Sequence, residues 1–159
     1  MRHQVEPRPA IAADLDAVMA LERATENAPH WPSTAYNTIL VESANSPERC
    51  LFVAYIADRL AGFAVALIRP IVDGVVRTAE LESVAVATFA RRTGVGRALC
   101  HTVFDWCRAR GATEIMLEVR ATSLDANCLY DSLGFNLVAR RPRYYRSPDD
   151  DALLRRLPL

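Results

Sequence analysis

Lysine is absent from this chain of 159 residues, and all 19 of its basic residues are arginine. Two kinds of site require lysine: the phosphate-binding loop of the GKS type and the Schiff base that holds pyridoxal phosphate. The sequence therefore excludes both. Because the formal net charge is zero, the overall charge indicates neither a nucleic-acid partner nor a membrane-surface partner.

Clustered metal ligands and long apolar runs are also missing. The chain has three histidines, and its four cysteines show no CxxC spacing, so we expect buried, reduced thiols and no metal site. The longest apolar run, Leu60 to Ile68, is too short to cross a bilayer, and the N-terminus lacks the apolar centre of a signal peptide. These absences predict a cytoplasmic protein. The cysteines are Cys50, Cys100, Cys107 and Cys128.

Length and composition indicate a single globular domain spanning residues 1–159. With 51% hydrophobic and 24% charged residues, the chain is able to bury a core without disulfides. Apolar periodicity predicts two helices, then a β meander, then a strand–helix–strand–helix unit followed by two strands. This order indicates an α+β fold with a parallel step in its second half.

The expected elements, by residue number, are helices at 14–23, from 33, at 95–110 and at 124–132, and strands at 4–8, 50–57, 61–71, 75–87, 113–119, 134–139 and 152–157. Turns are expected at 58–59 and 73–74, where an Asp is followed by Arg or Gly.

The most informative stretch joins the strand that ends at Ala87 to the helix that begins at about Val95. Its turn reads Arg91-Arg92-Thr93-Gly94-Val95-Gly96-Arg97. Amide groups at the start of a helix are free to bind an anion, and the helix dipole favours negative charge there. Arginines add positive charge at the same point. The turn therefore predicts a pyrophosphate site.

Two signatures in the second half of the chain carry a resemblance to a known family. The spacing Arg91-x-x-Gly94-x-Gly96 resembles the acetyl-CoA motif of the GNAT acetyltransferases, and the runs LEVR at 117–120 and LYDSLGF at 129–135 are similar to that superfamily's second signature. The pattern looks closest to the RimI-type alanine N-acetyltransferases of ribosomal proteins, in which an arginine-rich stretch ending in YY follows, as it does at 140–145. The resemblance covers residues 80–146, about two-fifths of the chain.

The resemblance implies a GNAT fold: a mixed, mostly antiparallel sheet of six to seven strands flanked by about four helices, with a splayed central parallel strand pair. It implies acetyl-CoA as acetyl donor and a protein or peptide N-terminal α-amine as acceptor. By position, Glu118 matches the general base and Tyr130 the general acid. The residues that the resemblance places at acetyl-CoA are Val84, Ala85, Val86, Arg91, Arg92, Gly94, Val95, Gly96, Arg97, Ala98 and Ser123.

The sequence departs from the relatives' pattern at three places. Ser123 replaces an Asn that binds the cofactor in relatives, Thr88 replaces the Pro that usually follows the strand, and the region around Trp31 differs from the relatives' Pro-Trp-Ser. Glu82 is a second candidate for the base. Glu80 and Glu82 share one face of their strand, where they are able to form salt bridges.

Three alternatives remain open at this level. In the first, the acceptor is a small-molecule amine. In the second, the chain is a CoA-binding module without catalysis. A Rossmann dinucleotide site is the third alternative, although Leu99 occupies its third glycine position. We expect no nucleic-acid or membrane partner, and either a monomer or a homodimer.

Overall fold

The computed structural model describes residues 4–45, 48–69 and 76–159. Within these residues it contains four α-helices and seven strands around one sheet. The helices are α1 (Leu15–Ala24), α2 (Ser33–Asn45), α3 (Val95–Ala109) and α4 (Leu124–Leu133). The strands are β1 (Arg8–Pro9), β2 (Arg49–Ile56), β3 (Arg59–Ile68), β4 (Thr78–Val86), β5 (Glu114–Arg120), β6 (Asn136–Tyr145) and β7 (Asp150–Pro158).

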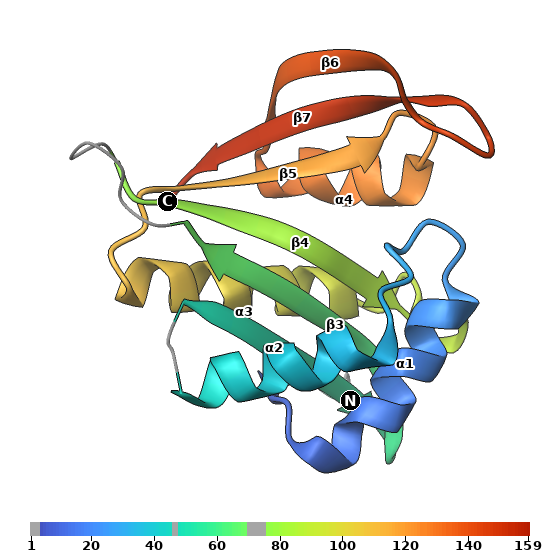
Figure 1. Cartoon of the computed structure of the whole chain (residues 1–159), viewed down its shortest axis with the longest axis vertical. Helices are drawn as coiled ribbons and strands as arrows, with labels where there is room; N and C mark the ends of the chain where they lie inside the picture. The colour runs from blue at the N-terminus through green and yellow to red at the C-terminus, as the bar shows by residue number, and fades with distance from the viewer. Residues whose placement is uncertain (1–3, 46–47, 70–75) are drawn as a thin grey trace.

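The strands lie in the order β1-β2-β3-β4-β5-β7-β6, and β4 with β5 is the parallel pair. Every other neighbouring pair is antiparallel. α3 makes the crossover between the two parallel strands and packs on β2, β3 and β4. Figure 1 shows the resulting two arms, with β3 and β4 below and β5, β7 and β6 above, which diverge from a common end.

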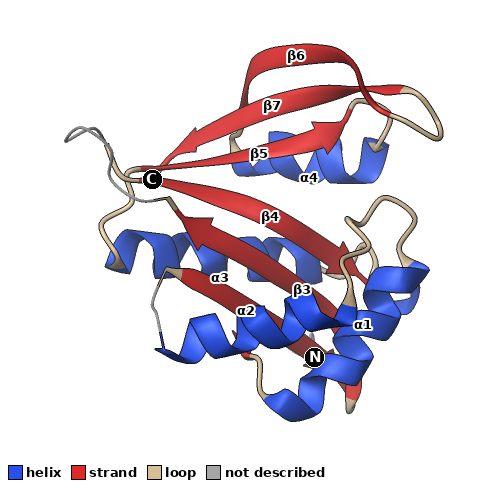
Figure 2. Cartoon of the chain, viewed as in Figure 1, coloured by secondary structure: helices blue, strands red, loops and turns tan. Residues whose placement is uncertain are grey.

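Each face of the sheet carries its own hydrophobic core. On one face α1 and α2 cover β2, β3 and the end of β4, with Tyr36, Ile39 and Phe63 fully buried between them. On the other face α3 and α4 pack on the sheet through a larger core that includes Leu99 and Ile115. The helices therefore form a layer on each side, as Figure 2 shows.

A β-bulge interrupts β4 at Glu82. Val65 pairs with Ser83 while Ala66 pairs with Leu81, so Glu82 is the extra residue between them. The bulge shifts the alternation of faces, and Leu81 before it and Val84 after it both pack on the α3 side. The bulge thus bends the strand next to the place where β4 and β5 separate.

The predicted fold class is confirmed, with corrections at particular elements. The first strand covers only Arg8–Pro9 rather than 4–8, because Pro7 and Pro9 have no amide hydrogen to donate to a neighbouring strand. β6 continues to Tyr145, beyond the expected end at Ala139. Cys128 is exposed on α4, against the expectation that all four thiols are buried. The turn at 73–74 lies outside the described residues.

Candidate active site

The gap between β4 and β5 is the central feature of the site. The two strands pair only from Thr78 to Glu80 on β4 and from Glu114 to Met116 on β5. Beyond these residues, the edge of β4 that faces β5 has no strand partner as far as Val86. Three of the predicted acetyl-CoA residues, Val84, Ala85 and Val86, lie on this unpaired edge. The backbone groups of Val84 and Val86 point away from β3 and are therefore available to a ligand that runs along the strand, whereas those of Ala85 face Phe63 on β3.

The turn between β4 and α3 presents a row of free amide groups. In the described structure, the backbone N–H groups from Arg92 to Arg97 donate no hydrogen bond, and the first helical bond runs from Ala98 N to Gly94 O at 3.0 Å. Gly94 has φ 93°, a left-handed conformation that glycine adopts without strain. A Cβ there would meet nothing within 4 Å, so the backbone angle and not space requires glycine. The turn therefore has the uncovered amides on which the sequence-based prediction of an anion site depends.

Gly96 and Arg97 also fix the helix that carries the turn. A Cβ at Gly96 would lie 3.1 Å from Leu129 Cδ2 on α4, so glycine allows α3 and α4 to approach closely. Arg97 Nη2 donates to Ser132 Oγ at 3.2 Å, again on α4. The N-terminus of α3 is thereby held beside the helix that carries Tyr130.

A cavity of about 480 Å³ opens at the C-terminal end of β4. It connects two of the predicted cofactor residues, Val86 and Arg91, with the end of α1. The Arg91 side chain reaches back toward the carbonyl oxygen of Val86, with Nε 3.5 Å from it. The cavity is lined by Leu21, Ala24, Thr25, Arg59, Val86, Ala87, Thr88, Phe89 and Arg91.

Glu118 lies on the face of β5 opposite α4. Its neighbours Leu117 and Val119 point into the core on the α4 side, and the Glu118 side chain retains 29% of its exposure. Arg141 Nη1 from β6 is 3.4 Å from Glu118 Oε1. The pKa of Tyr145 is raised by burial and by the nearby Glu118 charge. Glu118 is thus a solvent-accessible carboxylate at the start of the gap, as a base that acts through water requires.

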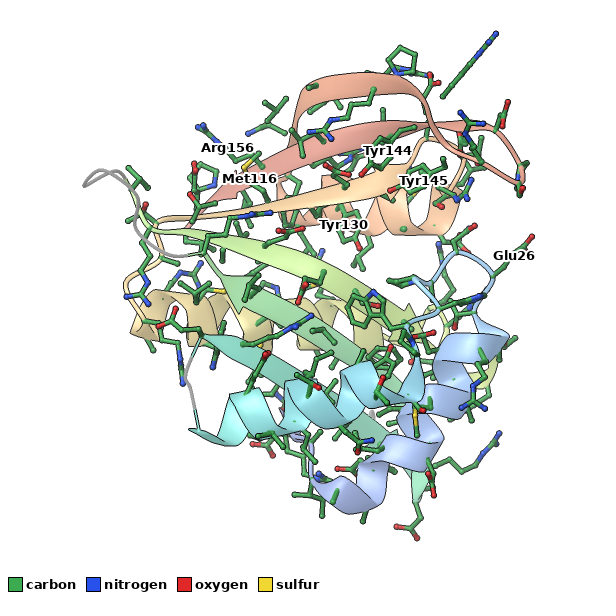
Figure 3. The ribbon with its side chains drawn as sticks, viewed as in Figure 1. Glu26, Met116, Tyr130, Tyr144, Tyr145 and Arg156 are labelled. Carbon is green, nitrogen blue, oxygen red and sulfur yellow. The ribbon has the colours of Figure 1, made fainter. Side chains whose placement is uncertain are left out.

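Tyr130 lies on the other side of β5, on α4. Its side chain is buried against Phe135, with ring centroids 5.5 Å apart. Burial raises the pKa of the Tyr130 hydroxyl, so this group keeps its proton at neutral pH. Within the described residues the hydroxyl has no hydrogen-bond partner. Figure 3 shows Tyr130 below β5, and Tyr144 and Tyr145 near the end of that strand.

Glu82, the second candidate base, is already occupied. Arg49 donates to both of its carboxylate oxygens, from Nε at 2.9 Å and from Nη2 at 3.0 Å. The Arg49 guanidinium also lies 5.7 Å from the ring centre of Trp31. Burial raises the pKa of Glu82, although Arg49 opposes this effect. Glu80 likewise pairs with Arg69, so both carboxylates form the salt bridges expected of them.

Ser123 lies in the turn between β5 and α4, where it contacts the loop between α1 and α2. Asn27 Nδ2 donates to Ser123 Oγ at 3.2 Å. A second cavity, of about 240 Å³, lies beside this contact. It is lined by Glu26, Asn27, Arg120, Thr122, Ser147 and Pro148. Ser123 is therefore next to a polar pocket formed by three loops.

Comparison with known proteins agrees with this geometry. Residues 15–135 match the Acetyltransferase (GNAT) family. The ribosomal protein bS18-alanine N-acetyltransferases of Salmonella typhimurium and Escherichia coli K12 are each 33% identical over 149 residues, which covers 92% of both chains. The chain belongs to the GNAT acetyltransferase family.

Solved structures of GNAT proteins have the same arrangement. The crystal structure of the Escherichia coli ribosomal-protein-S18-alanine N-acetyltransferase matches with a TM-score of 0.77 and 28% identity, covering 98% of this chain and 94% of that one. A GCN5-related N-acetyltransferase from Kribbella flavida matches with a TM-score of 0.78 and 27% identity, covering 98% of each chain. The dinucleotide alternative is wrong, because this sheet is mostly antiparallel and the family is an acetyltransferase family.

Sequence reasoning missed the buried polar network that supports the GNAT site. Arg155 on β7, only 7% exposed, donates to Asn127 Oδ1 at 3.2 Å and pairs with Asp131 at 2.6 Å. Asn127 in turn donates to the carbonyl oxygens of Arg120 and Ser123. The network ties α4 to β7 and fixes the turn after β5. An arginine within the apolar run of β7 was the signal that pointed to it.

Among the helices of the described residues, none is both long and apolar enough to cross a membrane.

Proposed function

We propose that this GNAT acetyltransferase transfers the acetyl group of acetyl-CoA to the α-amine of a protein or peptide N-terminus. The gap between β4 and β5 is the observation that carries the proposal. The proposal is further supported by an unpaired strand edge on β4, a row of free amides before α3, a carboxylate on β5 and a protonated tyrosine on α4. These are the groups that an acyl transfer to an amine requires.

The donor side of the gap is built from backbone. Amides from Arg92 to Arg97 would hold the pyrophosphate of acetyl-CoA, because they are free and lie at the positive end of the α3 dipole. The unpaired edge at Val84 and Val86 would hold the pantetheine arm as it would hold an added strand. Arg91 and Arg92 are exposed at the same turn and add positive charge.

The acid and the base lie on opposite faces of β5. Glu118 would accept a proton from the acceptor amine, through water, as the new C–N bond forms. Tyr130 would donate its proton to the sulfur as the C–S bond breaks. An amine that arrives on the open face and a thiolate that leaves toward α4 match this placement. The Arg49 contacts of Glu82 favour Glu118 as the base.

A protein N-terminus is supported as acceptor by the relatives and by the second cavity. The ribosomal protein bS18-alanine N-acetyltransferases, 33% identical to this chain, act on an alanine of a protein according to their name. The cavity beside Asn27 is polar and opens between three loops. An α-amine has an ordinary pKa of about 8, well below that of a lysine side chain, so a carboxylate acting through water is sufficient to deprotonate it.

A peptide panel tests this proposal. Thiol release would be measured with peptides that begin with a free alanine, with the same peptides blocked at the N-terminus but carrying lysine, and with small polyamines. We expect turnover with the free N-terminus. Preference for lysine peptides or polyamines would reject the acceptor, and acetyl-CoA binding without turnover on any amine would support the non-catalytic alternative.

Glu118→Gln tests the base. The variant keeps the shape of the side chain and should lower turnover at neutral pH by roughly a hundredfold, the usual contribution of general base catalysis. The loss should shrink above pH 8, where the amine is already free. Glu114→Gln on the same strand is the matched control, because Glu114 pairs with Thr78 and Arg156 away from the gap. A wild-type pH–rate profile for Glu118→Gln would assign the base elsewhere.

A further inference from the structure

Several arginines without an ion-pair partner in the described structure lie around the turn between β4 and α3. Nine of the described arginines form ion pairs with carboxylates, on every part of the fold. Four arginines near the turn form none in the described structure: Arg59, Arg91, Arg92 and Arg97. Guanidinium groups without a carboxylate partner beside free amides indicate an anionic ligand with more than one charged group.

Arg59 comes to this cluster from a distant part of the sequence. It begins β3, directly after the turn that ends β2, and its Cζ lies 3.9 Å from the centre of the Phe89 ring. Phe89 belongs to the short 3-10 helix Thr88–Ala90 between β4 and α3. The neighbouring Asp58 forms no ion pair with Arg59 in the described structure. The stacking holds an otherwise flexible cation in one place, which lowers the entropy cost of binding an anion.

Arg59 and Phe89 line the 480 Å³ cavity together with Val86 and Arg91. The rest of that wall comes from the end of α1, so this part of the cavity lies on the opposite side of the sheet from α3. The free amides at the start of α3 suit a pyrophosphate. Arg59 lines the neighbouring cavity with Phe89 and Arg91, just before those amides in the chain, where it suits a second phosphate.

We propose that Arg59, stacked on Phe89, binds the 3′-phosphate of the acetyl-CoA adenosine. The assignment rests on the proposed acetyl-CoA function and adds to it a residue outside the GNAT motifs. The 3′-phosphate is the one anionic group of the donor that the turn amides leave without a partner in this arrangement. A guanidinium offers it a two-point, charge-assisted contact.

Binding of two acetyl donors to the full-length protein tests this assignment. Dissociation constants would be measured by calorimetry for acetyl-CoA and for acetyl-3′-dephospho-CoA, which lacks only that phosphate. We expect the wild type to bind acetyl-CoA at least tenfold more tightly, since a charge-assisted hydrogen bond contributes about that factor. Arg59→Ala should remove this preference and leave the affinity for the dephospho donor unchanged. Arg59→Lys, which keeps the charge and loses the planar stack, should give an intermediate ratio.

Arg110→Ala is the matched control, because Arg110 also stacks on an aromatic ring, that of Trp106 at 4.4 Å, at the far end of α3. It should keep the wild-type ratio. An Arg59→Ala ratio equal to that of the wild type overturns the assignment, and so does an equal loss for both donors. If wild-type protein binds neither donor, the proposed function itself fails.

Discussion

Replacing Tyr130 with phenylalanine separates its role in the core from its role in catalysis. The aromatic ring is buried against Phe135 and would stay in place. Only the hydroxyl is lost, and in the described residues this group has no hydrogen-bond partner to leave unpaired. The substitution therefore changes the proposed proton donor and almost nothing else.

The two expected magnitudes differ enough to be distinguished. The free energy of unfolding should change by less than about 1 kcal/mol, because no intramolecular hydrogen bond is broken. The rate of acetyl transfer should fall roughly a hundredfold, since general acid catalysis contributes at least that much. A hundredfold loss corresponds to about 2.7 kcal/mol of transition-state stabilisation.

Stopped-flow detection of the released thiol, in a single turnover, measures the chemical step directly. Tyr55→Phe is the matched control, because the Tyr55 hydroxyl donates to Asp14 Oδ1 at 2.7 Å, far from the gap. It should lower the free energy of unfolding by roughly 2 kcal/mol, as for a hydrogen bond to a charged group, and leave the rate intact. If Tyr130→Phe retains the wild-type single-turnover rate, Tyr130 is not the acid.

Two further predictions follow from polar contacts. Ser123→Ala and Asn27→Ala should each raise the acceptor KM several-fold, without an additive effect in the double variant, because both remove one hydrogen bond of about 1 kcal/mol. If Ser123→Ala alone weakens the affinity for acetyl-CoA, Ser123 binds the cofactor and not the acceptor. Hydrogen bonds from Arg8, which has the largest effect, and from Ile11 and Tyr55 lower the pKa of Asp14 to about 2. The ionised carboxylate therefore stabilises the fold above about pH 4. Denaturant melts should show about 2 kcal/mol lost as the pH falls through the folded pKa, and Asp14→Asn should lack this loss.

Local sequence patterns were sufficient to predict the helix that begins at Val95 and the turn before it. The apolar positions of α3 repeat at helical spacing, and a left-handed glycine and free amides follow from the chain itself. The motifs around Glu118 and Tyr130 also name candidate residues without any knowledge of distance. Strand β6 was predicted only to Ala139, because an edge strand exposed on both faces, with Pro142 and a run of arginines, shows no period-two pattern.

The sequence by itself determined the family motifs, the order of the elements and the residues able to carry the chemistry, since these depend on residue type and short spacing. Only the tertiary structure decided which of them are free to act. It joined Arg49 to Glu82 across 33 positions, Asn27 to Ser123 across 96, and Arg59 to Phe89 across a strand pair. The resemblance implied that the parallel pair splays, but the residues at which β4 and β5 separate, Glu80 and Met116, depend on strand register, which residue type and short spacing do not fix.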